Sequence, residues 1–189
     1  STQPSGTSAI IHRALDWLPA TLNSAGYEPF GAPHLRRLVA QWYDARGLAT
    51  DPGQIVVTTG AMSAVSVTLH TLLSPGQRIA VDSPTYPGAL GAIEAVHAKA
   101  VSVPLVGGWD VPGWASVLRR SRARAAYLIP EVHNPTGLLM PGPQREELAK
   151  LLRDQDCVPV VDETLTELDL DAGDQFANKE GLDDVIVGA

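Results

Sequence analysis

The stretch AAYLIPEVHNPTG, residues 125–137, contains the features that decide the fold. Residues 125–129 are apolar and form a run of the length expected for a strand. The run leads into His133-Asn134-Pro135-Thr136-Gly137, in which Asn-Pro permits a cis peptide bond and Thr-Gly completes a tight turn. Ligands of parallel sheets bind where strands end, so this turn is a candidate for function as well as for a simple chain reversal.

The same alternation of short apolar runs and helical stretches continues on both sides of this segment. The sequence predicts further strands at residues 55–59, 78–82, 101–105, 158–162 and 185–187. It predicts helices at residues 35–46, 61–73, 88–96, 114–120 and 143–153. Strands that alternate with helices need crossover connections, so we expect an α/β fold with a mainly parallel sheet and helices on both faces.

Length and composition are those of one globular domain. The chain has 189 residues, 44% of them hydrophobic, and no apolar run approaches the roughly 20 residues of a membrane span. The net charge of −7 argues against nucleic-acid binding by this chain, and the one arginine-rich patch, residues 119–124, is expected to be a solvated helix end. Cys157 is the single cysteine, which favours a reducing compartment, so we expect a cytoplasmic protein with a buried, inert thiol.

Four loops at predicted strand ends each offer one chemical group. They offer the helix start Gly60-Ala61-Met62, the ring of Tyr86 between two prolines, the amide of Asn134 and the carboxylate of Asp162. A helix start can hold an anion, and a rigidly held ring can stack on a planar ligand. Each group also has a purely structural interpretation. Gly60 could form a tight turn, the Tyr86 ring could cover the core, and Asn134 could belong to a simple chain reversal. Asp162 could cap a helix or form a turn. The five histidines never pair at metal-ligand spacing, so no metal site is expected.

In this order and at these intervals, the four elements resemble the large domain of class I/II, fold-type I aminotransferases, which use pyridoxal 5′-phosphate (PLP) and have the aspartate aminotransferase-like fold. The resemblance assigns the PLP phosphate to Gly60, Ala61 and Met62, the ring face to Tyr86, the 3′ oxygen to Asn134 and the pyridinium nitrogen to Asp162. A carboxylate beside that nitrogen keeps it protonated, which makes PLP an electron sink. Upstream, the segment from Tyr27 to Gly31 resembles one whose tyrosine reaches the PLP phosphate of the partner subunit, which implies a homodimer.

Within this family the sequence is most similar to the aminotransferase-like domain of MocR-type, GntR-family transcription regulators. Residues 127–137 and Gly108-Trp109-Asp110 carry that similarity. It implies an amino acid or other small amino compound as effector, and DNA binding only through an N-terminal winged-helix domain outside this chain. A stand-alone amino-acid aminotransferase is the alternative interpretation, and a generic α/β binding module is a third.

Two departures from the family pattern bear on catalysis. Leu165 stands where the family usually has a tyrosine that tunes the 3′ oxygen. The Schiff-base lysine is expected beyond the last residue, since none of Lys99, Lys150 and Lys179 matches its motif; Lys150 is predicted on a helix and the other two in loops. We therefore expect a linker-like segment with a helix at residues 1–26, a truncated PLP-binding large domain at 27–189, and no transaminase activity for this chain alone.

Overall fold

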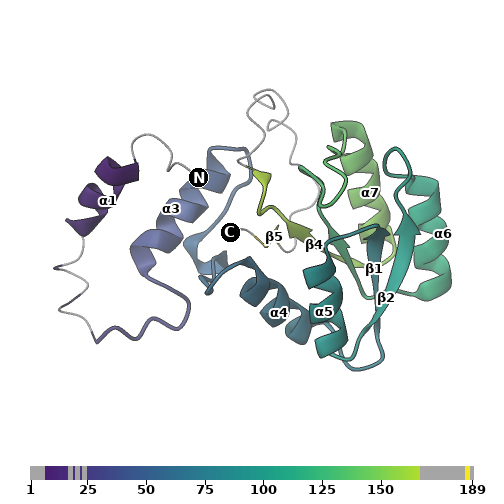
Figure 1. The fold of residues 1–189 in the computed structure, drawn as a ribbon, viewed down its shortest axis with the longest axis horizontal. Helices are drawn as coiled ribbons and strands as arrows, with labels where there is room; N and C mark the ends of the chain where they lie inside the picture. Colours follow the sequence, from purple (N-terminus) through teal and green to yellow (C-terminus); the bar gives the residue numbers. More distant parts are fainter. Residues whose placement is uncertain (1–6, 17–18, 20–21, 23–24, 167–185, 188–189) are drawn as a thin grey trace.

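The computed structural model describes residues 7–16, 19, 22, 25–166 and 186–187, and Figure 1 shows how they are arranged. The helices are α1 (Thr7–Leu15), α3 (Pro33–Asp44), α4 (Ala61–Leu72), α5 (Pro87–Ala95), α6 (Val111–Ser121) and α7 (Gly142–Asp154), with a short 3-10 helix η1 (Pro52–Gln54). The strands are β1 (Arg78–Ser83), β2 (Lys99–Pro104), β3 (Ala125–Leu128), β4 (Val158–Asp162) and β5 (Ile186–Val187).

These strands form one sheet in the order β2-β1-β3-β4-β5, and every neighbouring pair is parallel. Helix α5 connects β1 to β2, α6 connects β2 to β3, and α7 connects β3 to β4. Parallel neighbours require such crossovers because, after each strand, the chain must return to the edge where that strand began before the next strand can start. The predicted α/β fold, with a parallel sheet flanked by helices, is confirmed.

Each face of the sheet has its own buried cluster, because successive side chains of a strand point to opposite faces. On one face, Ile79 and Val81 of β1 pack with Tyr127 of β3 and with apolar residues of α4 and α5. On the other face, Ala80 and Leu128 pack with residues of α6 and α7. Figure 1 shows the two helix pairs on either side of the strands, and we call these sides the α4–α5 face and the α6–α7 face.

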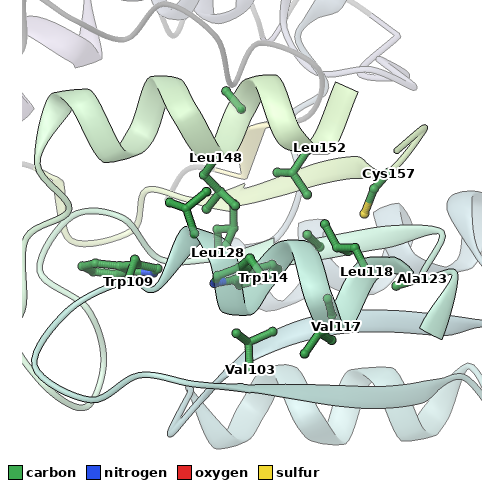
Figure 2. Close-up of a cluster of buried hydrophobic side chains, with 14 of the residues drawn as sticks. Val103, Trp109, Trp114, Val117, Leu118, Ala123, Leu128, Leu148, Leu152 and Cys157 are labelled. Atoms are coloured by element: carbon green, nitrogen blue, oxygen red, sulfur yellow. The ribbon is translucent and has the colours of Figure 1, made fainter. Parts of the chain in front are cut away.

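Two tryptophans anchor the cluster on the α6–α7 face. Trp114 of α6 and Trp109, in the loop before it, are both buried. Figure 2 shows them among aliphatic side chains that include Val103 of β2, Leu128 of β3 and Leu148 of α7. Large rings fill the space between helix and sheet that small strand residues such as Ala80 and Ala126 leave open.

The predicted strand at residues 55–59 is wrong. The segment is extended, but its recorded backbone contacts are isolated: Ile55 N–H donates to the Pro52 carbonyl at 3.3 Å, Val57 N–H donates to the Phe30 carbonyl at 3.0 Å, and Arg36 Nε donates to the Ile55 carbonyl at 2.8 Å. Its β-branched side chains favour extended backbone, whereas a strand also needs a neighbour with which to form a ladder, and Val56 and Val57 remain exposed.

Other predicted boundaries shift by up to three residues. Lys99, predicted in a loop, is the first residue of β2, and Lys150 lies exposed on α7 as predicted. Helix α1 begins at Thr7, within the segment 1–26 that is expected to contain a helix, and α3 begins at Pro33. The predictions for residues 1–6, Lys179 and Val185 lie outside the described residues.

The arginine-rich patch lies at the amino-terminal edge of the sheet, at the end of α6. Arg119 and Arg120 are in the last turn, and Arg122 is the left-handed C-cap. A cavity of about 650 Å³ at this edge is lined by Arg119 and Arg122 together with Arg78 and Arg124, and Arg78 donates a hydrogen bond to the Ser121 carbonyl. Cations there complement the exposed carbonyls, which agrees with a solvated helix end.

In the part of the chain that the structure describes, no helix has the length and apolar character needed to cross a membrane.

Candidate functional site

The carboxyl ends of β1, β3 and β4 lie at one edge of the sheet and carry three of the predicted site residues. β1 leads into the loop that contains Tyr86, β3 leads into the turn that contains Asn134, and β4 ends on Asp162. The strands are parallel and aligned, with Leu128 beside Val161 and Asp162 beside Val187, so these residues emerge at the same edge. This is the position at which open α/β sheets bind ligands.

Asp162 is only 7% exposed, and both of its carboxylate oxygens accept hydrogen bonds. Tyr127 Oη donates to Oδ2 at 2.5 Å, and the backbone N–H of Thr164 donates to Oδ1 at 3.0 Å. Among the described residues, the structure records no basic side chain within ion-pair distance of this carboxylate. Asp162 is therefore a buried carboxylate that is oriented by two donors and that retains capacity to meet a cation.

Tyr127 is a site residue that sequence reasoning missed. It pairs in register with Val160, so Asp162, two residues further along β4, points to the same face of the sheet. Burial first, and then the charge of Asp162, raise the pKa of the Tyr127 hydroxyl above its ordinary value, with a smaller contribution from Tyr86. One sequence feature could have identified this residue: the Tyr127 hydroxyl is the one polar side-chain group in an otherwise apolar strand, and a buried polar atom needs a hydrogen-bond partner.

Tyr86 is the N-cap residue of α5, and its half-buried ring packs against the cluster on the α4–α5 face, which contains Tyr127. Gly88 makes room for this ring, because a Cβ at that position would lie 2.5 Å from Tyr86 Cε1. The absence of a side chain at Gly88 thus lets the aromatic ring lie against the first turn of α5. A ring fixed in this way can present a face to a planar ligand.

The start of α4 is a free helix N-terminus on the same face. Gly60, the N-cap, has φ +115°, a conformation that favours glycine, and it supplies no side-chain cap. No acidic residue occupies the first turn; instead Thr59 and Ser63 share a hydroxyl–hydroxyl hydrogen bond of 2.8 Å. Ala61 packs against the cluster that contains Tyr127, and Met62 is 38% exposed. The first-turn amides are suited to an anion.

Asn134 is half-buried in the turn that follows β3, and its bond to Pro135 is cis, as is Ser83-Pro84. His133 frames the turn on both sides: its N–H donates to the Leu138 carbonyl at 2.9 Å, and its carbonyl accepts from Gly137 N–H at 2.6 Å. The sequence prediction of a tight turn at this position is confirmed. The structure records no contact between the Asn134 side chain and the Asp162 carboxylate.

The structure does not bring Tyr27 to the other predicted residues. Its side chain is 82% exposed in the segment that precedes α3, and no contact with Asp162, Tyr86 or Gly60 is recorded in the described part of the chain. The family resemblance places this tyrosine in the partner subunit's site, so its position within one subunit is compatible with that assignment.

Two buried networks brace the loops behind the site, and sequence reasoning missed both. Tyr43 of α3 donates to Glu163 Oε2 at 3.0 Å, and burial, followed by the charge of Glu163, raises the pKa of the Tyr43 hydroxyl. Arg145 of α7 bonds Glu131 at 3.1 Å in the loop after β3. Glu163 follows Asp162 directly in the sequence, and Glu131 lies three residues before Asn134, so each link joins a helix to a loop that carries a predicted site residue. Neither link is visible as a local sequence pattern.

The donor set fits PLP. An uncapped helix start suits a phosphate, a fixed ring suits the face of a pyridine, and a buried carboxylate without a recorded cationic partner suits a pyridinium N–H. The departure at Leu165 remains, since this half-buried side chain has no hydroxyl to offer to a 3′ oxygen.

Known proteins are similar to this chain in sequence and in fold. A family model described as aminotransferase class I and II matches residues 6–187. The 2-aminoadipate transaminase of Thermus thermophilus is 33% identical over 144 residues, which cover 76% of this chain and 34% of that protein. The HTH-type transcriptional regulator YdcR of Escherichia coli is 30% identical over 142 residues, which cover 74% of this chain and 30% of the regulator.

Solved structures agree on the fold. An archaeal alanine:glyoxylate aminotransferase superposes with a TM-score of 0.85 at 24% identity, covering 97% of this chain and 48% of that one. LysN, the α-aminoadipate aminotransferase of Thermus thermophilus complexed with N-(5′-phosphopyridoxyl)-L-leucine, has a TM-score of 0.69 at 30% identity, covering 80% and 40%. The chain thus spans less than half the length of these relatives.

Proposed function

Because the chain belongs to the class I and II aminotransferase family, we propose that it binds PLP at the carboxyl edge of its sheet, as the amino-compound-sensing domain of a MocR/GntR-type transcription regulator. The observation that carries the proposal is Asp162, a buried carboxylate with two hydrogen-bond donors and, in the described residues, no recorded cationic partner. A carboxylate in that state is stabilised by a cation, and a pyridinium N–H provides one.

The remaining residues bind and orient the cofactor. The first-turn amides of α4, at Gly60, Ala61 and Met62, hold the phosphate, and the ring of Tyr86 stacks on the pyridine. Asn134 donates its side-chain amide to the 3′ oxygen. PLP, when bound, supplies an electron sink for the α-carbon of an amino compound. Tyr127 contributes indirectly, by holding Asp162 in place.

The similarity to a helix-turn-helix regulator favours sensing of an amino acid or other small amino compound, with DNA bound by a separate winged-helix domain. Leu165 supports the same conclusion, because it removes a hydroxyl that the family uses to tune the 3′ oxygen. The second candidate is a stand-alone amino-acid aminotransferase, and the similarity to 2-aminoadipate transaminase favours it.

We also propose that the protein is a homodimer. Apolar side chains are exposed along the first helices, including Ile11 and Leu15 of α1, Leu38 of α3, and Met62 and Val67 of α4. Exposed apolar surface of this kind marks interaction sites, and a twofold dimer buries the same patch on both copies. The exposed Tyr27 lies in the segment between α1 and α3, where it can reach a partner's cofactor.

The test is an absorbance titration of PLP into the full-length protein and its Asp162→Asn variant, followed by a panel of amino acids. The substitution keeps the shape of the side chain and removes the charge. We expect a changed PLP spectrum and a blunted response to amino acids, with the fold intact. Asp154→Asn, at an exposed position on α7, is the matched control and should behave like the wild type.

Identical spectra and ligand responses in wild type and Asp162→Asn would reject the assigned role. A capping role alone predicts a loss of at most about 1 kcal/mol of stability and an unchanged spectrum. The two candidate functions separate on the next measurements, which are ketoacid release and DNA binding in the presence of the amino compound. Turnover at enzyme rates without an effect on DNA binding selects the aminotransferase, and the opposite result selects the regulator.

A further inference from the structure

A second buried acid lies beneath the same edge of the sheet, on the opposite face from Asp162. Asp82 is the penultimate residue of β1 and points to the α6–α7 face, as Ala80 does. It is 2% exposed. Its Oδ2 accepts a hydrogen bond from Trp109 Nε1 at 3.0 Å and lies 3.8 Å from His133 Nε2, whereas Oδ1 has no hydrogen-bond partner.

His133 connects this acid to the turn that carries Asn134. The imidazole is 1% exposed and packs edge-on against Trp109, with 5.7 Å between ring centroids. Its Nδ1 is hydrogen-bonded to Thr136 Oγ1 at 2.9 Å, and its Nε2, which faces Asp82, has no hydrogen-bond partner. The two ring nitrogens therefore touch different parts of the molecule, one the end of β1 and the other the turn at residues 134–137.

We infer that Asp82 and His133, 3.8 Å apart, together carry one exchangeable proton, either on the carboxylate or on Nε2, which we call the shared proton. Its presence makes the two side chains positioning residues for the turn at residues 134–137, a role that rests on the proposed function of Asn134. With one shared proton between the carboxylate and Nε2, the proton on Nδ1 stays in place and Nδ1–H donates to Thr136 Oγ1. When the shared proton leaves for solvent, the remaining proton is drawn to Nε2, beside the carboxylate. Nδ1 then accepts from the Thr136 hydroxyl, so the hydrogen bond that frames the turn reverses direction.

The surroundings of the pair favour the shared proton at moderate pH. Burial raises the pKa of Asp82 to about 7 despite the indole N–H groups of Trp109 and Trp114, and burial lowers the pKa of His133. From the elements packed against Asp82, namely the loop before α6, α6 itself and the loop after β3, the one titratable group recorded at ion-pair distance in the described chain is His133. In that last loop Glu131 is bonded to Arg145.

The sign of the pH dependence follows from Asp82. Its folded pKa is raised above its unfolded value, so its contribution to stability is fully present below about pH 4 and is lost as the pH rises through about 7. His133 has the opposite sign, with stability lost as the pH falls through its lowered folded pKa. Above pH 7 the wild type therefore keeps a buried carboxylate that has the Trp109 hydrogen bond but no cationic partner recorded among the described residues.

Asp82→Asn tests this inference because the introduced amide supplies an N–H toward Nε2 where the protonated acid supplies an O–H. We expect the thermal midpoint of the full-length protein to rise by several degrees at about pH 8.5 and to be unchanged at about pH 5. Asp110→Asn, at the exposed N-cap of α6, is the matched control and should shift neither midpoint, since the Asp110 side chain makes no capping hydrogen bond that the substitution could remove. An equal loss of stability at both pH values would mean a fixed ion pair and would overturn the inference.

Nitrogen NMR of the His133 ring gives a readout that a merely structural role does not move. In the wild type we expect Nδ1 to carry the proton at about pH 5.5 and Nε2 to carry it at about pH 8.5, and in Asp82→Asn we expect Nδ1–H at both. Thr136→Val, at an exposed position, removes the hydroxyl that Nδ1 contacts and should expose Nδ1–H to rapid exchange. A ring that keeps Nε2–H throughout in the wild type would refute the shared proton even if Asp82→Asn did not fold.

The NMR and melting experiments need no cofactor, so they separate this inference from the proposed function. With PLP present, the absorbance of the wild type should titrate with a component near neutral pH that Asp82→Asn lacks. If PLP does not bind but the ring proton moves as expected, the proposed function fails and the shared proton stands. If PLP binds and its spectrum has the same pH profile in both proteins, the positioning role is wrong.

Discussion

Replacing Tyr127 with phenylalanine removes one hydroxyl and one buried hydrogen bond while keeping the ring that packs on the α4–α5 face. A hydrogen bond to a charged group contributes about 1.5–3 kcal/mol, and Oδ2 of the buried Asp162 loses its donor. We therefore expect the free energy of unfolding to fall by about 2 kcal/mol at neutral pH. With a urea dependence of about 2 kcal/mol per M, the unfolding midpoint falls by about 1 M.

The matched control is Tyr86→Phe, which removes the same hydroxyl from a neighbouring, half-buried ring for which the described structure records no hydrogen bond. We expect its midpoint to stay within about 0.5 kcal/mol of the wild type. The measurement is urea unfolding followed by circular dichroism. Equal losses in the two variants would show that the Tyr127–Asp162 hydrogen bond contributes nothing, and would refute the orientation of Asp162 by this donor.

The pH dependence gives a second check on Tyr127. Its folded pKa is raised above the ordinary value of about 10, so its contribution is fully present below about pH 10 and is lost as the pH rises further. The reason is that the tyrosine of the unfolded chain ionises first. The stability difference between wild type and Tyr127→Phe should therefore shrink above about pH 10, and a constant difference would contradict this reasoning.

Two further predictions concern packing around the site and in the core. Gly88→Ala places a methyl group 2.5 Å from the Tyr86 ring, so we expect a loss of about 1–3 kcal/mol in thermal unfolding and weaker PLP binding, whereas Gly91→Ala on the same helix, where a Cβ meets nothing within 4 Å, should be neutral or stabilising. Burial raises the pKa of the Cys157 thiol to about 12, so a thiol reagent should modify Cys157 only after unfolding; rapid labelling of the folded protein at neutral pH would contradict its burial.

The two faces of the sheet contribute different residues to the carboxyl edge. On the α4–α5 face, Tyr127 donates to Asp162, and Ala61 at the start of α4 and Tyr86 pack against the cluster that contains the Tyr127 ring. On the α6–α7 face, Asp82 lies beside His133, whose ring is hydrogen-bonded to Thr136 in the turn that carries Asn134. Because successive strand residues point to opposite faces, one edge can present groups from both sides to a single ligand.

The sequence by itself determined the fold class and the positions of the polar loops. Both depend on neighbouring residues: apolar runs of strand length, helical periodicity, and turn chemistry such as that of Asn134 and Pro135. The same local information failed at residues 55–59, where β-branched residues favour an extended backbone but no neighbouring strand pairs with them. A strand is a property of two segments, and a single stretch of sequence specifies only one of them.

Only the tertiary structure decided which side chains meet. Tyr127 and Asp162 are 35 residues apart, Asp82 and Trp109 are 27 apart, and Tyr43 and Glu163 are 120 apart. Each contact depends on strand order and register, because a shift by one residue turns a side chain to the other face. Asp162 was recognisable from the sequence as a strand-end carboxylate. The hydroxyl that orients it became identifiable only when β3 was placed beside β4 with Tyr127 opposite Val160.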